Sequence, residues 1–270
     1  MTYPFADIEL ARRLERTEAR GNVNFVVARQ RAFPDRGATW IEVAGTYAMF
    51  DGATSPVTQT FGLGMFEPIT AEHMDTLEEF FQSRGAPVFH EVCPLADPSV
   101  FQHLNERNYG PVEMTNVLYR PIDVDLRLDA SRNPGLNVRV VEKDEVDLWA
   151  QTSGEGWSEF VEVADFMREL NQVVAHSSGL RFLAELEGRA VAAGALTIVD
   201  DVALLAGAST IPTARRQGAQ LALLEGRLRH AAAQGCTVAM MGAQPGSGSQ
   251  RNAERHGFRI AYTRTKWGHR

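Results

Sequence analysis

Two adjacent arginines and a glycine stand immediately before a predicted helix. Arg215, Arg216 and Gly218 lie between a run of small residues ending at Thr210 and a helix that begins near Ala219. The first turn of a helix has unpaired N–H donors and the positive end of the helix dipole, so an anion finds donors and charge together. Glycine allows the backbone to approach closely, and the arginines add attraction. The pattern predicts an anion site, of a kind that suits a phosphate.

Other residues have types that suit metal binding but not the spacing. His73 is distant from the adjacent pair His90 and Glu91, and no second pair at ligand spacing accompanies them. The two cysteines, Cys93 and Cys236, also stand alone. Because zinc ligands usually recur at short, regular spacings, we expect no metal site. Two isolated cysteines favour a reducing compartment.

The composition indicates a soluble protein with a substantial core. Of 270 residues, 44% are apolar and 23% charged, and the net charge is −7. A general nucleic-acid binder usually presents a basic face, so we expect no nucleic-acid partner. The sequence shows neither a leader pattern at its start nor a run of about 18 apolar residues, so we expect a cytoplasmic protein without a membrane partner.

Elements that would position the anion site follow from periodicity and turn residues. In the first half we expect helices over 5–19 and 70–84, with 23–33 open between helix and strand, and extended runs over 39–50 and 56–64 joined by a turn at Asp51-Gly52. Strands at 87–92 and 112–119, with a short helix between them, complete this half. In the second half we expect strands at 136–141, 182–186, 190–199, 202–210, 237–243 and 258–267, helices after 144, near 166–174 and up to 234, and a loop over 153–160.

Turn and helix-end residues of the two halves match at a nearly constant offset in residue number. Asp51-Gly52 and Asp200-Asp201 are 149 residues apart, Gly85 and Gly235 are 150 apart, and Asn108 and Gly257 are 149 apart. Asn readily replaces Gly at a left-handed helix end. We therefore interpret the chain as a duplication with a first copy at 1–122, a linker at 123–135 and a second copy at 136–270, the first copy lacking its initial strand.

The second half resembles the GCN5-related N-acetyltransferase (GNAT) superfamily. Two motifs carry the resemblance: Pro212-x-x-Arg215-x-x-Gly218-x-Gln220, and the stretch from Ser249 to Phe258, which ends in Gly-Phe before the last strand. The resemblance covers about 136–267. It implies an α/β (α+β) fold with two tandem GNAT-like domains, each a mixed, mostly antiparallel sheet flanked by helices.

The resemblance also implies that acetyl-CoA is the co-substrate. The backbone amides of the loop would bind its pyrophosphate, and the end of the preceding strand would bind its pantetheine arm. The implied cofactor-binding residues are Ala208, Ser209, Thr210, Arg215, Arg216, Gln217, Gly218, Ala219 and Gln220. Gln220 departs from the family pattern, where the residue is small, so its side chain must either point away from the cofactor or hydrogen-bond to it.

The family's usual acid is absent from this chain. The position four residues before the glycine of Gly-Phe, often a tyrosine in the family, is Ala253. Ser249 and Asn252, on a short helix that the sequence predicts after the flexible stretch 245–249, could donate to the departing thiolate; the alternatives are a helix cap for Ser249 and a surface polar residue for Asn252. Tyr262 on the last strand is a further candidate acid, and packing in the core is the alternative interpretation.

Candidate bases flank Trp157 in the expected loop. Glu155 and Glu159 lie in a region that lines the acceptor side in the family, and Glu185 lies on a strand. Each is also well explained as a solvated charge, and a chain of water molecules could equally deprotonate an amine.

The first half lacks the residues that would bind coenzyme A. Its positions equivalent to the loop fall near residues 65–70, which contain Pro68 but no arginine and no glycine. We therefore expect a degenerate first copy and one active copy, which transfers acetyl groups to a small amine or amino-acid-like acceptor in a ternary complex, as a monomer or homodimer. The alternatives are an acyl-CoA-binding sensor without efficient transfer, favoured by Ala253, and an interaction module whose loop binds another phosphate ligand.

Overall fold

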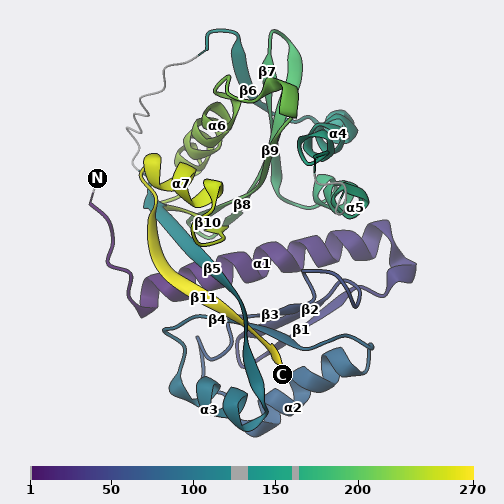
Figure 1. Cartoon of the computed structure of the whole chain (residues 1–270), viewed down its shortest axis with the longest axis vertical. Coiled ribbons are helices and arrows are strands. Elements are labelled where there is room, and N and C mark those ends of the chain that lie inside the picture. Colours follow the sequence, from purple (N-terminus) through teal and green to yellow (C-terminus); the bar gives the residue numbers. More distant parts are fainter. Residues whose placement is uncertain (1, 123–132, 160–163) are drawn as a thin grey trace. The chain divides into compact units, whose positions relative to one another are not determined.

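Two compact units make up the chain in its computed structural model, which describes residues 2–122, 133–159 and 164–270 (Figure 1). One unit consists of Pro121–Ala239, and the other of Thr2–Arg120 together with Met240–Arg270. This division differs from the expected domains 1–122 and 136–270, because residues from 240 onward group with the first half of the chain. Most of the expected linker, from 123 to 132, lies outside the described residues.

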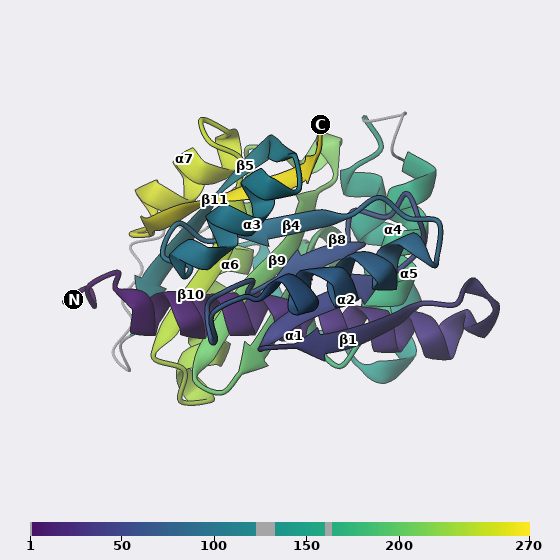
Figure 2. The same ribbon diagram turned by 90° about the horizontal axis from the view of Figure 1, so that it is seen from below.

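The unit formed by residues 2–120 and 240–270 is built on α1 (Ile8–Ala32) and a mixed sheet. Its other elements are η1 (Pro34–Arg36), β1 (Thr39–Val43), β2 (Thr46–Phe50), β3 (Gln59–Phe61), α2 (Ala71–Gln82), β4 (Phe89–Val92), α3 (Pro98–Glu106), β5 (Tyr109–Pro121), α7 (Gly248–Arg255) and β11 (Arg259–His269). The strand order is β1-β2-β3-β4-β11-β5, and the only parallel pair among the described registers is β3–β4. Figures 1 and 2 show α1 on one face of these strands and α2 and α3 on the other.

A single capped helix replaces the short helix and the ambiguous stretch expected at the start of the chain. The Asp7 carboxylate accepts the Leu10 N–H at 3.0 Å, which caps α1. Apolar residues continue to face the core beyond residue 19, and Val23 and Val26 are buried. The stretch 23–33, open between helix and strand in the sequence, is therefore helical to Ala32.

The last strand explains why the end of the chain groups with its beginning. β11 pairs antiparallel with β4 and with β5, so it lies between two strands that are neighbours in sequence order. Thr265 is opposite Val92 on one side and Met114 on the other. The sheet of this unit is therefore continuous from β4 to β5 only because β11 lies between these two strands.

The second unit is a sheet that is antiparallel from β6 to β9 and covered by helices on both faces. Its elements are β6 (Leu136–Val140), η2 (Lys143–Glu145), α4 (Val146–Gly156), α5 (Ala164–Ala175), β7 (Leu180–Leu186), β8 (Arg189–Val199), β9 (Val202–Thr210), η4 (Pro212–Ala214), α6 (Ala219–Ala233) and the start of β10 (Val238–Ala243). The strand order is β10-β9-β8-β7-β6. Figure 1 shows α4 and α5 on one face of β7–β9 and α6 on the other. A core of Trp149, Leu183 and Ala193 fills the α4 side.

Both halves of the chain run through the same order of elements after their first helices. Three strands, a helix, a strand, a helix and a strand follow one another from β1 to β5 and again from β7 to β11. The residues expected to match at helix ends all have positive φ: Gly85 (65°), Gly235 (80°), Asn108 (59°) and Gly257 (80°). The expected Asn108 geometry is confirmed. One turn was missed: Ala44-Gly45 divides the extended run 39–50 into β1 and β2.

Candidate functional site

The N-terminus of α6 has backbone donors and no side-chain cap. Gly218 is its N-cap residue, in the left-handed region at φ 89°, ψ 1°. The first hydrogen bond of the helix runs from the Ala222 N–H to the Gly218 carbonyl at 2.9 Å. The N–H groups of Ala219, Gln220 and Leu221 therefore have no acceptor within the helix. This is a geometry in which an anion could complete the helix end.

The N-terminus of α2, the corresponding helix of the first half, is capped by side chains of its own first turn. The Thr70 hydroxyl accepts the His73 N–H at 3.2 Å, and the His73 ring accepts the Thr70 N–H at 3.4 Å, in a capping box. His73 thus takes the place of the usual Glu or Gln. The N-termini of α2 and α6 differ accordingly, because α2 supplies its own acceptors and α6 does not.

Gln220 lies across the loop from the end of β9. Its Nε2 donates to the Thr210 Oγ1 at 2.7 Å, and the side chain is half-buried. The side chain therefore ties the first turn of α6 to the strand that precedes the loop. The contact gives the large side chain at this position, where the motif favours a small one, a hydrogen-bond partner within the protein.

The two arginines of the loop have different surroundings. The Arg215 guanidinium forms an ion pair with Glu159 and donates to the carbonyl oxygens of Thr210 at 3.3 Å and Gly156 at 3.4 Å. Arg216 is exposed, at φ 63°, and its side chain forms no hydrogen bond or ion pair with the described residues. Arg215 thus fastens the loop to the end of α4, and Arg216 is the arginine available to an anion from solvent.

A bulge interrupts β9 next to this loop. Ala195 of β8 is opposite Ala206, but Ala193 is opposite Ser209, so two residues of β9 face Gly194 alone. One of them, Gly207, has φ 59°, and a Cβ built on it would meet no atom within 4 Å. Ala206 and Gly207 are exposed although the strand is flanked by neighbours on both sides. An extended ligand could pair with the backbone here.

Helix α4 packs closely against the same part of β9. A Cβ built on Gly156 would lie 2.5 Å from the Ser209 Oγ and 3.0 Å from the Thr210 nitrogen, so only glycine fits. The Ser209 hydroxyl donates to the Ser153 carbonyl at 3.0 Å, and the Ser153 hydroxyl donates to the Asn171 Oδ1 at 3.0 Å. Sequence reasoning missed these contacts, although the glycines of 153–156 within a helix were a signal.

The carboxylates considered as bases have other roles or lie in solvent. Glu155 belongs to the last turn of α4 rather than to the expected loop, is exposed and accepts a hydrogen bond from Gln151 at 2.9 Å. Glu159 pairs with Arg215, and Glu185 pairs with Arg139 at 2.9 Å. Among these three, Glu155 alone has no arginine partner in the described ranges 2–122, 133–159 and 164–270.

The candidate acids belong to the other unit. Ser249 and Asn252 lie on α7 and are exposed, while Ala253 is 1% exposed and packs inward. The cap of α7 is Ser247, which accepts the Gln250 N–H, so the capping role considered for Ser249 is wrong. Tyr262 packs as expected: it is buried and donates to the Glu15 carboxylate at 2.8 Å.

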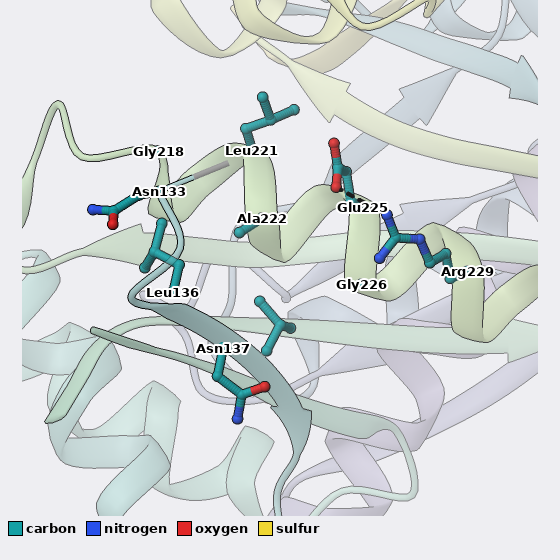
Figure 3. Close-up of a pocket in the computed structure, with 10 residues that line it drawn as sticks. Asn133, Leu136, Asn137, Gly218, Leu221, Ala222, Glu225, Gly226 and Arg229 are labelled. Atoms are coloured by element: carbon teal, nitrogen blue, oxygen red, sulfur yellow. Dashed lines mark hydrogen bonds and ion pairs between the residues drawn. The ribbon is translucent and has the colours of Figure 1, made fainter. Parts of the chain in front are cut away.

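A groove of about 180 Å³ runs along α6 from its N-terminus, opposite β6. Small residues make room for it, and a Cβ on Gly226 would lie only 2.6 Å from the Val138 Cγ1. Figure 3 shows Asn133 and Leu136 beside Gly218, with Glu225 and Arg229 further along the helix. The groove is therefore continuous with the uncapped helix end.

Neither a cluster of metal ligands nor a membrane-spanning helix occurs in the part of the chain that the structure describes. No group of three or more His, Cys, Asp and Glu residues is placed to hold a metal ion there. His90, one of the residues considered, is fully buried, with its Nδ1 2.9 Å from the Thr60 hydroxyl. No described helix is both long and apolar enough to cross a membrane.

The segment that contains the α6 loop and the β9 bulge is also similar to a known family. Residues 146–258 match the acetyltransferase (GNAT) family. The matched GNAT segment begins at the start of α4 and ends just before β11, so it includes the bulge, the loop and α7. A comparison with curated proteins found no match.

Solved structures share the fold over nearly the whole chain. A GCN5-related N-acetyltransferase from Kribbella flavida is 20% identical, with a TM-score of 0.64 over 90% of this chain and 93% of that one. A tandem GNAT protein from the clavulanic acid biosynthesis pathway, solved without AcCoA, is 11% identical, with a TM-score of 0.59 over 98% and 96%. A GCN5-related N-acetyltransferase from Sphaerobacter thermophilus is 15% identical, with a TM-score of 0.56 over 85% and 75%. The expected α/β fold with mostly antiparallel strands is confirmed.

Proposed function

We propose that this protein transfers the acetyl group of acetyl-CoA to the amine of a small or amino-acid-like acceptor. The observation that carries the proposal is the uncapped N-terminus of α6 beside the exposed bulge of β9. The amides from Arg216 to Gln220 would bind the pyrophosphate. The backbone from Ala208 to Thr210 would pair with the pantetheine arm, and the GNAT match of this segment supports the assignment.

The proposed reaction is a direct attack in a ternary complex. The acceptor nitrogen forms a bond to the acetyl carbon, the carbon–sulfur bond breaks, and coenzyme A leaves as a thiolate that takes up a proton. The amine loses its proton to Glu155 or to water, since Glu155 is exposed on the α4 side of the bulge. We further propose Ser249 and Asn252 as donors to the thiolate.

The first half of the chain is proposed to be a degenerate copy that does not bind coenzyme A. Its elements follow the same order, but the Thr70–His73 capping box closes the helix end that would otherwise receive phosphate. Thr70→Ala tests this proposal, because it removes the cap of α2 without supplying a loop that could bind coenzyme A. Acetyl-CoA binding should then still saturate at one site per chain.

Thermal unfolding with and without acetyl-CoA tests the main proposal. A ligand that binds the folded state raises the melting temperature by mass action. Arg216→Gly should shrink the shift, because it removes the exposed charge while keeping the amide and the positive φ, and Arg189→Ala, the loss of another exposed arginine of the same unit, should not. No shift at millimolar acetyl-CoA would end the proposal.

A second function is supported by one observation, the buried alanine at position 253 where the family often has a tyrosine acid. A protein that binds acyl-CoA without efficient transfer would act as a sensor. Thiol release over a panel of amines separates the two functions, since cofactor binding without turnover on any acceptor would favour the sensor.

A further inference from the structure

A buried guanidinium on α6 faces the sheet next to the bulge. Arg227 follows Leu223 by four residues, is 3% exposed, and donates from Nε to the Leu223 carbonyl at 3.2 Å. Its Nη1 donates to the carbonyl oxygens of Ala195 at 3.1 Å and Ala206 at 3.3 Å. One side chain thus joins a helix to two strands.

The charge of Arg227 is balanced by dipoles rather than by a carboxylate. Among the described residues its hydrogen-bond acceptors are all backbone carbonyls, and no acidic side chain pairs with it. Burial lowers its pKa to about 10, so the group remains a cation at neutral pH. A buried cation without a counter-ion is costly, and an apolar side chain would fill the same space more cheaply. The need to fill space in the core therefore does not explain why position 227 is an arginine.

The two carbonyls that Arg227 holds mark the point where the β8–β9 register changes. Ala195 and Ala206 are directly opposite each other, and the extra residue of the bulge follows at once. Gly194, which faces the bulge, approaches the guanidinium so closely that a Cβ there would lie 3.2 Å from the Arg227 Cζ. The Trp149 Nε1 donates to the Gly194 carbonyl at 3.2 Å. The bulge is thus held by a side chain from α6 and by one from α4.

We propose that Arg227 is a positioning residue for the pantetheine arm of acyl-CoA. By fixing the Ala195 and Ala206 carbonyls, it holds the bulge of β9, where Gly207 is exposed and Ala208 half-buried, in the shape that lets the backbone from Ala208 onward pair with the arm. The inference rests on the proposed function of β9. It assigns to Arg227 no contact with the phosphates, which bind at the other end of the loop.

Two ligands that differ by the pantetheine arm test this assignment. Coenzyme A has the arm, and 3′-phosphoadenosine 5′-diphosphate has the same phosphates without it. Calorimetric titration of Arg227→Met should show the affinity for coenzyme A lowered about tenfold and that for the nucleotide changed by less than about twofold. Arg227→Lys keeps a charged donor and should recover part of the loss. Arg189→Met, the same change at an exposed arginine at the start of β8, should leave the ratio of the two affinities unchanged.

The outcomes distinguish this inference from the proposed function. An equal loss for both ligands, or no loss for coenzyme A, in Arg227→Met would overturn the role of Arg227 while leaving coenzyme A binding in place. If Arg227→Met does not fold, Arg227→Lys decides by the same ratio, and an unchanged ratio overturns the inference. If the unaltered protein binds neither ligand, the proposed function itself fails, and the role of Arg227 fails with it.

Discussion

The side-chain amide of Gln220 donates to the hydroxyl of Thr210 at 2.7 Å, joining the first turn of α6 to the last residue of β9. The contact spans the loop that we propose binds the pyrophosphate, so it fixes the distance between the phosphate and pantetheine ends of the site. Gln220→Ala should lower the affinity for acetyl-CoA by about tenfold, the order expected for one hydrogen bond.

A double-mutant cycle with Thr210→Val checks the reason for that loss. If the two side chains act through their mutual bond, the double variant should bind no more weakly than either single variant. Fully additive losses would show that each residue acts separately.

The contact between Gly156 and Ser209 should make position 156 intolerant of any side chain. Gly156→Ala places a Cβ 2.5 Å from the Ser209 Oγ, so α4 or β9 must shift, and we expect the free energy of unfolding to fall by about 1–3 kcal/mol. Gly154→Ala is the matched control on the same helix, where the nearest atom would lie at 4.0 Å. Urea unfolding measures both, and equal stabilities would contradict the packing described.

Gly218 should matter for binding beyond its effect on stability. Gly218→Ala forces a non-glycine residue to φ 89° and should cost about 1–2 kcal/mol, with a misplaced first turn of α6. Gly188→Ala imposes a similar strain at φ 79° in the β7–β8 hairpin, where a Cβ would meet no atom within 4 Å. Both variants should lose stability, but only Gly218→Ala should weaken acetyl-CoA binding in calorimetry. Equal affinities for the two variants would remove Gly218 from the site.

Glu91 should make the protein less stable as the pH rises. It is 5% exposed, and burial raises its pKa from 4.5 to about 7, against the opposing charges of Arg264 and Lys266 and with the like charges of Glu18 and Glu15 adding to the rise. Since the folded state holds this proton more tightly, the stabilisation is complete below pH 4.5 and is lost as the pH rises through 7, by on the order of 3 kcal/mol. Glu91→Gln should therefore be more stable relative to the unaltered protein at pH 8 than at pH 5. A stability difference independent of pH would refute this.

His90 should make the protein less stable as the pH falls. It is fully buried, and burial lowers its pKa from 6.5 to about 3, with the positive charges of His269 and Arg107 contributing. The neutral ring stabilises the fold above pH 6.5, and by pH 5 about 2 kcal/mol should be lost, since the unfolded chain then binds a proton that the folded one does not. The NMR shift of the His90 ring should stay constant from pH 8 to 5. A titration midpoint near 6.5 would contradict the assignment.

Local chemistry made much of the fold predictable. Thr70 and Gly85 bound a helix close to its observed ends, and Asn108 has the positive φ expected of a residue standing in for glycine. These features depend on a few neighbouring residues. The pairing of β11 with β4 and β5 could not be read in the same way, because the partners are more than a hundred residues apart and no short pattern records them.

The part of the candidate site that is formed by backbone groups could be predicted from the sequence. The side-chain contacts that hold this backbone in place could not. The Arg215–Gly218 loop follows from its residue types, but the inward turn of Arg215 toward Glu159 depends on where α4 ends. Arg227 did leave a signal in the sequence, since a charged residue four positions after Leu223 and four before Ala231 lies on the apolar face of a helix. That signal could be interpreted only with the β8–β9 register, which places the carbonyls bound by Arg227 at the bulge.

Calorimetric titration of the full chain with acetyl-CoA measures the proposed cofactor site itself. We expect saturable binding at one site per chain, abolished or strongly weakened when the α6 loop is altered by Arg216→Gly together with Gly218→Ala. Binding that does not saturate up to millimolar acetyl-CoA, or that is indifferent to the loop, would contradict it.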